Sequence, residues 1–385
     1  MLQPLIDFVR DHYHTNDFIP LHVPVFGGNE KAYVAETIDS TFVSSVGAFV
    51  DRFEQDMAAY TGSPRAVATV NGTAALHVAL RLVDVGPSDY VITQPLTFVA
   101  TCNAIAYCGA MPIFVDVDRH TLGLSPKALA EWLEAHAYRD DRGLCRRREG
   151  NGVIRACLPM HTFGHPADLD GLLRVCTDWG LALVEDAAES LGSTYHGRHT
   201  GTVGDVGTLS FNGNKVITTG GGGMILADQA LGKRAKHLTT TAKQPHVYEY
   251  VHDELGYNYR LPNLNAALGC AQLEQLDAYL TEKRQLAADY AACLAGSDVT
   301  FVTEPAGCRS NYWLNAVICT DHEQRDQLLK ATNEQGIMTR PIWQLMNRLP
   351  MYNHAPAGEL SNALWLEARV VNLPSGIRAG EEELG

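Results

Sequence analysis

The sequence has few charged residues and lacks any long apolar run. Charged residues make up 19% of the 385 positions and apolar residues 46%, a composition typical of a folded chain rather than a disordered one. Every apolar stretch is interrupted well before the roughly 18 residues that a membrane-spanning helix needs. Basic residues are outnumbered, 30 against 44 acidic, and the net charge of −14 argues against a broad nucleic-acid groove. A small phosphorylated ligand is still compatible, because a few local donors can hold it.

Cysteine pairs with the spacing of a redox or zinc motif are also missing. The nine cysteines are an odd number, no two are arranged as CxxC, and most have apolar neighbours. Buried free thiols in a reducing cytoplasm are therefore expected. The first fourteen residues contain Asp and His and have no apolar signal core, so they predict a short amphipathic helix and a cytoplasmic protein.

From about residue 66, short apolar runs alternate with helical patterns. The runs are apolar throughout, as in strands that are buried on both faces. Repeated strand–helix units indicate an α/β fold with a parallel sheet. The expected strands are 66–70, 90–94, 111–117, 153–160, 181–187, 207–212 and 223–228.

The pattern changes after about residue 229. Residues 263–296 predict one long helix or two, with Gly296 as the C-cap, and the remaining residues predict a smaller α+β unit. We therefore expect an N-terminal segment (1–28), a large domain (29–262), and a long helix with a small C-terminal domain (263–385).

Three short motifs carry residues suited to chemistry, and each has a structural alternative. Asn71, Gly72 and Thr73 separate a strand from a small-residue helix, which suits either a phosphate site or a hairpin turn. Asp186 follows a strand and could pair with a cationic ring nitrogen or cap a helix. Lys215, in a loop rich in Gly and Thr, is either a nucleophile or a solvated surface group.

One histidine-containing loop bears a superficial likeness to a metal site. His161 and His165 occur with Asp168 and Asp170, but their spacing matches no standard set of ligands. Histidines with ordinary loop partners are the favoured interpretation, and no metal is predicted.

Taken together, the motifs follow the order found in pyridoxal-phosphate (PLP) enzymes of the aspartate aminotransferase type. A phosphate cup precedes an Asp at a strand end, and a Ser stands five residues before a Lys. Over nearly its whole length the chain resembles sugar aminotransferases of the DegT/DnrJ/EryC1/StrS family. The segments that carry the resemblance are NGTAAL (71–76), QPLTFVAT (94–101), HTFGHPADLD (161–170), VEDAAES (184–190), SFNGNK with TTGGGG (210–223), GYNYR (256–260) and NYWLN (311–315).

Within that family, four segments are most similar to the nucleotide-sugar C4-aminotransferases of legionaminic acid synthesis: 20–34, 42–54, 210–215 and 340–346. The resemblance implies a PLP-binding large domain with a mostly parallel seven-stranded sheet, and PLP as cofactor. It also implies amination of a 4-keto-6-deoxy nucleotide sugar by glutamate in surface-glycan synthesis, with UDP-2-acetamido-2,6-dideoxy-4-hexulose as acceptor. The alternatives are a GDP-4-keto-6-deoxymannose aminotransferase and a PLP-dependent sugar dehydratase.

The resemblance also assigns roles around the cofactor. Lys215 would bond covalently to it and shuttle a proton, and Asp186 would keep its ring nitrogen protonated. Thr73, the backbone of Ala74 and the Ser210 hydroxyl would hold the phosphate.

Five further residues follow from the same resemblance. Phe98 would stack on the ring, although it could be plain core. Glu189 stands near the phenolic oxygen, where the family usually has Gln or His, and if ionised it would repel a phenolate. Asn258 would reach the phosphate from the neighbouring subunit, which implies a homodimer. Arg260 and Arg340 could meet a substrate carboxylate.

Overall fold

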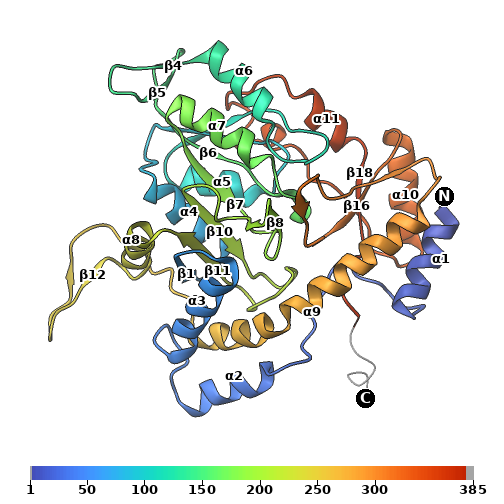
Figure 1. The fold of residues 1–385 in the computed structure, drawn as a ribbon, viewed down its shortest axis with the longest axis horizontal. Helices are drawn as coiled ribbons and strands as arrows, with labels where there is room; N and C mark the ends of the chain where they lie inside the picture. Colours follow the sequence, from blue (N-terminus) through green and yellow to red (C-terminus); the bar gives the residue numbers. More distant parts are fainter. Residues whose placement is uncertain (1, 379–385) are drawn as a thin grey trace.

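A seven-stranded sheet forms the centre of the molecule (Figure 1). The computed structural model describes residues 2–378, and its strand order in this sheet is β1-β11-β10-β7-β6-β2-β3. All neighbours from β10 to β3 are parallel, whereas β11 is antiparallel to both β10 and β1. The predicted α/β fold with a mostly parallel seven-stranded sheet is therefore confirmed. The strands are β1 (Arg65–Thr69), β2 (Tyr90–Thr93), β3 (Met111–Phe114), β6 (Ile154–Leu158), β7 (Ala182–Asp186), β10 (Val206–Ser210) and β11 (Gly223–Ala227).

Five helices begin at a residue whose side chain accepts a first-turn N–H, which fixes where each helix starts. At α4, Asn71 accepts from Ala74, so the Asn-Gly motif opens a helix and not a hairpin. The helices are α1 (Leu2–Tyr13), α2 (Glu30–Asp39), α3 (Ala48–Thr61), α4 (Gly72–Leu82), α5 (Val99–Tyr107), α6 (Pro126–His136), α7 (Leu169–Trp179), α8 (Gln229–Thr239), α9 (Asn263–Cys293), α10 (His322–Glu334) and α11 (Ser361–Glu367).

Burial on both faces of the central sheet explains its unbroken apolar strands. Along β11, Met224 and Leu226 belong to a core that includes Phe53 of α3. Ile225, between them, belongs to the opposite core with Leu76 of α4. Successive strand residues point to opposite faces, so both faces demand apolar side chains.

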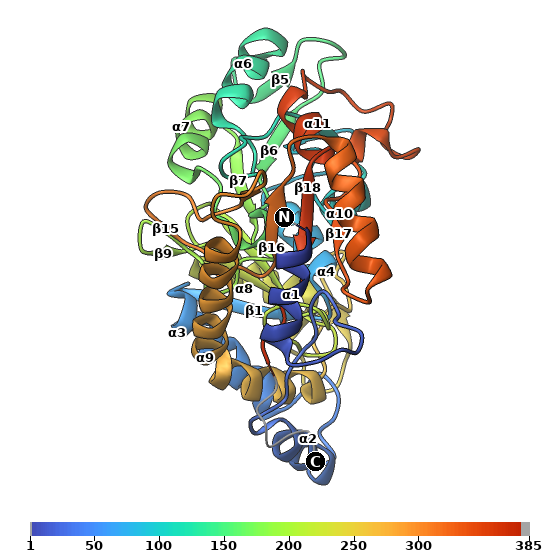
Figure 2. The same cartoon turned by 90° about the vertical axis from the view of Figure 1, so that its right-hand side faces the viewer.

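The helix α9 is continuous over 31 residues and crosses the molecule diagonally (Figure 1). Its C-cap is Leu294, so the prediction of Gly296 as the cap is wrong. Gly296 has a φ of +76° in the turn that follows. Near the start of α9, Ala266 packs in the core of the central sheet. Near the end of α9, Tyr290 packs in a cluster with residues of α1. Figure 2 shows these two helices next to each other. Because α9 packs both in the core of the central sheet and in the cluster with α1, the expected domain boundary at 262/263 stays a prediction.

A second, four-stranded sheet has the order β14-β16-β18-β17. Three small ribbons complete the strands, and one of them, β12–β13, extends away from the main body beyond α8 (Figure 1). These strands are β14 (Thr300–Phe301), β16 (Asn315–Ile318), β17 (Arg340–Pro341), β18 (Val370–Leu373), β4 (Ala137–Arg139), β5 (Cys145–Arg147), β8 (Thr194–Tyr195), β9 (Arg198–His199), β15 (Cys308–Arg309), β12 (Lys243–Gln244) and β13 (Val251–His252).

All nine cysteines are free, and seven of them are buried. Across residues 2–378, no helix is both long enough and apolar enough to traverse a bilayer.

Candidate active site

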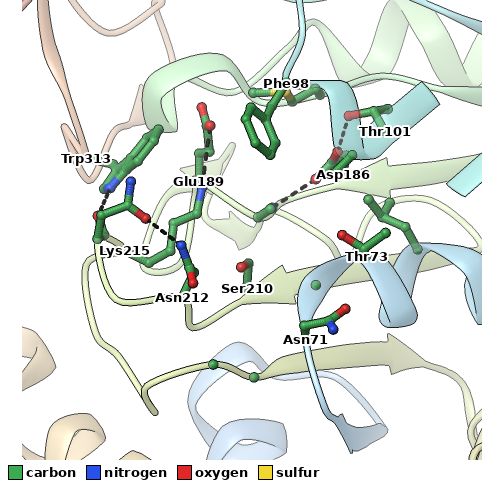
Figure 3. Close-up of a pocket in the computed structure, with 18 of the residues that line it drawn as sticks. Asn71, Thr73, Phe98, Thr101, Asp186, Glu189, Ser210, Asn212, Lys215 and Trp313 are labelled. Atoms are coloured by element: carbon green, nitrogen blue, oxygen red, sulfur yellow. Dashed lines mark hydrogen bonds and ion pairs between the residues drawn. The ribbon is translucent and has the colours of Figure 1, made fainter. Parts of the chain in front are cut away.

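A cavity of about 270 Å³ lies where β7 and β10 end and α4 begins. The carboxyl edge of a parallel sheet is where α/β proteins bind ligands, because loops from several strands meet there. Figure 3 shows Asp186 and Thr101 on one side of this cavity and Lys215 with Trp313 on the other. Ser210 lies between these two groups, and Thr73 lies below Asp186 in this view, both near Asn71.

Asp186 is buried at the end of β7, with an exposed fraction of 3%. Its carboxylate accepts hydrogen bonds from the Thr101 hydroxyl (2.8 Å) and the Ala188 N–H (3.2 Å). Both donors are neutral, and burial raises the pKa of Asp186 above its usual range. A cationic group placed in the cavity against this carboxylate would remove much of that burial cost.

Lys215 lies in the loop after β10, and 14% of its side chain is exposed. Its Nζ is 3.5 Å from Oε1 of Glu189 and 3.9 Å from the centroid of the Trp313 ring. The Trp313 Nε1–H donates to the backbone oxygen of Asn214 (2.7 Å), which holds the indole beside the lysine loop. Lys215 thus points into the cavity and is not a solvated surface group.

Glu189 is buried beside Lys215, and its Oε2 accepts the N–H of Phe163 at 2.9 Å. Burial raises the pKa of Glu189 to about 7, with a further increase from the nearby charge of Asp186 and a decrease from Lys215. The carboxyl group can therefore be neutral near physiological pH, which would remove the repulsion expected between an ionised Glu189 and a phenolate.

The N-terminus of α4 and the end of β10 form the part of the cavity suited to a phosphate. Gly72 approaches Ser210 so closely that a Cβ at this glycine would lie 2.8 Å from the Ser210 Cβ. Thr73 and Ser210 both line the cavity, as predicted. The Ala74 N–H, however, already donates to Asn71 at 2.7 Å, so phosphate binding by this group would require an exchange of partners.

Phe98 lines the same cavity and is 52% exposed, so it is not a core residue. Its place next to Asp186 and Glu189 in Figure 3 is compatible with stacking on a flat ring, which stays a prediction.

Three predicted residues lie away from the cavity walls that the described chain forms: Asn258, Arg260 and Arg340. The Asn258 side chain is exposed and accepts two hydrogen bonds from Arg260 (3.1 and 3.0 Å). Arg340, on β17, donates to Asn333 (3.1 Å) and to the backbone oxygen of Thr339 (2.9 Å). Their predicted roles, if correct, require either a second subunit or a ligand that extends beyond this cavity.

Several side chains of the cavity received no role from the sequence, among them one hydroxyl and two indole rings. Thr101 and Trp313 occur in the quoted segments QPLTFVAT and NYWLN, whereas Trp343 lies in the segment 340–346. A hydroxyl three residues after Phe98, on the first turn of α5, was the available signal for Thr101.

The two histidines of the 161–170 loop, His161 and His165, are fully buried. The Nε2 of His161 is 3.0 Å from Oε2 of Glu185, with both side chains fully buried. His165 stacks edge-on against Tyr312, and burial lowers its pKa to about 4.

The comparison with known proteins settles the family. The model of the DegT/DnrJ/EryC1/StrS aminotransferase family matches residues 25–384. The chain belongs to this family. It is 36% identical to a putative pyridoxal phosphate-dependent aminotransferase, EpsN, from Bacillus subtilis (strain 168), over 95% of this chain and 93% of the relative. It is also 36% identical to GDP-perosamine synthase from Escherichia coli O157:H7, over 93% of each chain.

Solved structures agree with this assignment. The aminotransferase TlmJ from Streptoalloteichus hindustanus superimposes with a TM-score of 0.83 and 28% identity, over 93% of each chain. The protein is therefore a PLP-dependent aminotransferase of the sugar-modifying kind, as the sequence motifs predicted.

The residues of the cavity fit the cofactor. Asp186 lacks a charged donor in the bonds described above, and the protonated ring nitrogen of PLP would supply one. Thr73 and Ser210, with the start of α4, would hold the phosphate, and Phe98 would cover the ring. Lys215, whose side chain lines the same cavity, would supply the amine to which PLP attaches. When bound, PLP withdraws electrons from the carbon that carries the reacting amine.

Proposed function

We propose that this enzyme transfers the amino group of glutamate to C4 of a 4-keto-6-deoxy nucleotide sugar. The observation that carries the proposal is a single cavity in which the Lys215 amine lies beside Glu189 and in which Asp186 also lies. Lys215 would take and return the proton that amination moves between the sugar and the cofactor, while Asp186 would keep the ring nitrogen protonated. The nine free cysteines support a reducing compartment, and we place the reaction in the cytoplasm.

Two acceptors are in competition. Resemblance of residues 20–54, 210–215 and 340–346 to the legionaminic-acid-type enzymes supports UDP-2-acetamido-2,6-dideoxy-4-hexulose, and with it a place in surface-glycan synthesis. The names of three relatives, each a GDP-perosamine synthase at 36% identity, favour GDP-4-keto-6-deoxymannose instead. A dehydratase on the same fold is disfavoured, because those enzymes resemble this family but carry His where Lys215 stands.

We also propose a homodimer whose subunits share each active site. The ribbon β12–β13 and the residues after it expose several large apolar side chains that one chain leaves in solvent. Large exposed apolar patches are typical of interaction sites, and these side chains are close together in the sequence. Asn258 follows the ribbon β12–β13 in the sequence and is also exposed to solvent, where a second chain could contact it. The exposed side chains are Val247 (93%), Tyr248 (81%), Tyr250 (82%) and Leu255 (80%).

The test of the acceptor is a panel of UDP-, GDP- and dTDP-linked 4-keto sugars with glutamate as donor, measured as kcat/KM. Preference for the UDP-linked 2-acetamido sugar is expected. A higher kcat/KM with GDP-4-keto-6-deoxymannose would move the enzyme to the perosamine-synthase branch. Absence of any amination, with a visible spectrum that glutamate leaves unchanged, would contradict the proposed function as a whole.

A further inference from the structure

Glu189 and Lys215 form a buried acid–base pair inside the cavity. Oε1 of Glu189 is 3.5 Å from the Lys215 nitrogen, and the exposed fractions of the two side chains are 3% and 14%. The ring of Trp313 covers another side of the same nitrogen, at 3.9 Å from the centroid. An aromatic face stabilises an ammonium group, so the pocket accommodates Lys215 in its charged form.

The other carboxylate oxygen of Glu189 is held by the backbone. Oε2 accepts the Phe163 N–H at 2.9 Å, and Phe163 has a φ of +58°, which costs energy for a residue other than glycine. The Asn311 amide fixes the Glu189 segment from another element by donating to the Glu189 backbone oxygen at 2.9 Å. The carboxyl is thus oriented with Oε1 toward the lysine, whichever charge it carries.

Within residues 2–378, the charged groups found to act on Glu189 are one base and one acid. Lys215 approaches from the loop after β10, and Asp186 approaches from the end of β7. The 161–164 segment contributes a neutral N–H, and the segment around Asn311 contributes a neutral amide. As soon as Lys215 loses its charge, an ionised Glu189 would be left buried beside another carboxylate, which is unfavourable.

We infer that Glu189 is the proton-holding partner of Lys215. When the lysine must act as a free amine, one N–H bond of its ammonium breaks and an O–H bond forms at Oε1 of Glu189. The pair changes from two charged groups to two neutral ones, and its total charge and proton count are unchanged. The bond from Phe163 to Oε2 persists in both states. Glu189 acts through Lys215 and is a positioning residue; the inference rests on the proposed function in requiring a neutral Lys215.

The chain contains a matched control pair outside the cavity. Glu54 also accepts a backbone N–H, from Ala68 at 2.9 Å, and a lysine, Lys236, at 2.6 Å. Its side chain is 12% exposed. Glu54→Gln therefore removes the same kinds of contact without touching Lys215.

The first measurement is a proton-binding difference titration of the cofactor-free full-length chain. The wild type is expected to bind about one more proton than Glu189→Gln, with a midpoint near neutral pH, where burial places the pKa of Glu189 at about 7. Glu54→Gln is expected to keep this proton. A Glu189→Gln curve that coincides with the wild type through the neutral range would overturn the inference.

The second measurement is the visible spectrum of the PLP-loaded protein as a function of pH, together with kcat and KM for glutamate. In Glu189→Gln we expect the spectral midpoint to move by about one pH unit or more. We expect kcat to fall about 10- to 100-fold with little change in KM. An unchanged midpoint and kcat would contradict the inference.

Should Glu189→Gln fail to fold, Glu189→Asp carries the same test, because it keeps a titratable group at a shorter reach. If the midpoint of the proton-binding titration in Glu189→Asp differs from that of the wild type, the inference is supported. If the two midpoints are the same, the inference is wrong. Because the first titration uses neither substrate nor turnover, loss of the proposed function would leave its result standing.

Discussion

Two lysines contact Trp313, one at its ring and the other at its backbone oxygen, and their surroundings differ. Lys215 contacts the indole ring and faces the cavity beside Glu189. Lys283, in α9, is 1% exposed and donates to the backbone oxygens of Trp313 (3.2 Å) and Ser375 (2.6 Å). Burial lowers the pKa of Lys283 to about 7. A perturbed buried lysine therefore does not by itself mark an active site; the cavity and the acid partner distinguish Lys215.

Replacing the lysine of the cavity should have the largest effect. Lys215→Ala is expected to reduce turnover by at least about 10³-fold, because no other group of the cavity supplies both the amine and the proton transfer. The melting temperature should change little. Lys236→Ala, which breaks the Glu54 pair outside the cavity, should retain activity. Near-normal turnover in Lys215→Ala would show that Lys215, like Lys283, is not required for the reaction.

Asp186→Asn should follow in magnitude. The variant is expected to retain the cofactor but to slow turnover by about 100-fold or more, because the amide cannot keep the ring nitrogen protonated. Turnover and bound PLP, measured in the same preparation, separate these effects. A turnover rate equal to that of the wild type would show that Asp186 is not needed for the reaction and serves only as a hydrogen-bond acceptor for groups such as the Ala188 N–H.

Lys283, the lysine that donates to the Trp313 backbone oxygen, should affect stability and leave the chemistry nearly unchanged. Folded Lys283 loses its proton near pH 7, whereas in the unfolded chain it keeps the proton to about pH 10.4. Between these pH values the unfolded state binds more protons. The lysine's contribution to the unfolding free energy therefore rises with pH, by up to about 1.4 kcal/mol per pH unit. Below about pH 7 both states are protonated and this slope disappears.

Lys283→Met should remove that slope. Chemical denaturation of the wild type and the variant between pH 7 and pH 9 tests it, with activity assayed in parallel. Parallel stability curves for the two proteins would show that Lys283 does not titrate on unfolding in this range. A loss of activity comparable to that of Lys215→Ala would show that Lys283 also serves the reaction.

The sequence predicted one half of the cavity well. Asp186 and Ser210 end strands β7 and β10, Thr73 lies in the first turn of α4, and Lys215 lies in the loop after β10. These ends meet at one edge of the sheet, so the convergence of the four residues follows from the order of strands and helices. For Asn71 the sequence left both a helix start and a hairpin turn open, and the structure shows the helix start.

The other half depends on packing between distant segments. Trp313 reaches Lys215 from a loop almost one hundred residues further along the chain, and periodicity carries no information about that approach. The Thr101 hydroxyl bonds to Asp186 only because α5 starts against the end of β7. Lys283 stands in the polar run TEKRQ (281–285) of α9, where a lysine is expected to reach solvent, yet it is buried.

Asn258 tests whether one chain completes the cavity, and its expected effect is the smallest. Asn258→Ala should weaken PLP binding by about tenfold, because one polar contact to the phosphate is worth roughly 1.5 kcal/mol or somewhat more. Co-expression with Lys215→Ala then tests the subunit arrangement at a PLP concentration too low for Asn258→Ala alone. If the residues come from different chains, a mixed dimer places both defects in one site and leaves the other native, so activity returns. If mixed dimers form but activity does not return, Asn258 belongs to its own chain's site or to no site. The cavity around Lys215 would then receive no Asn258 side chain from a neighbouring subunit.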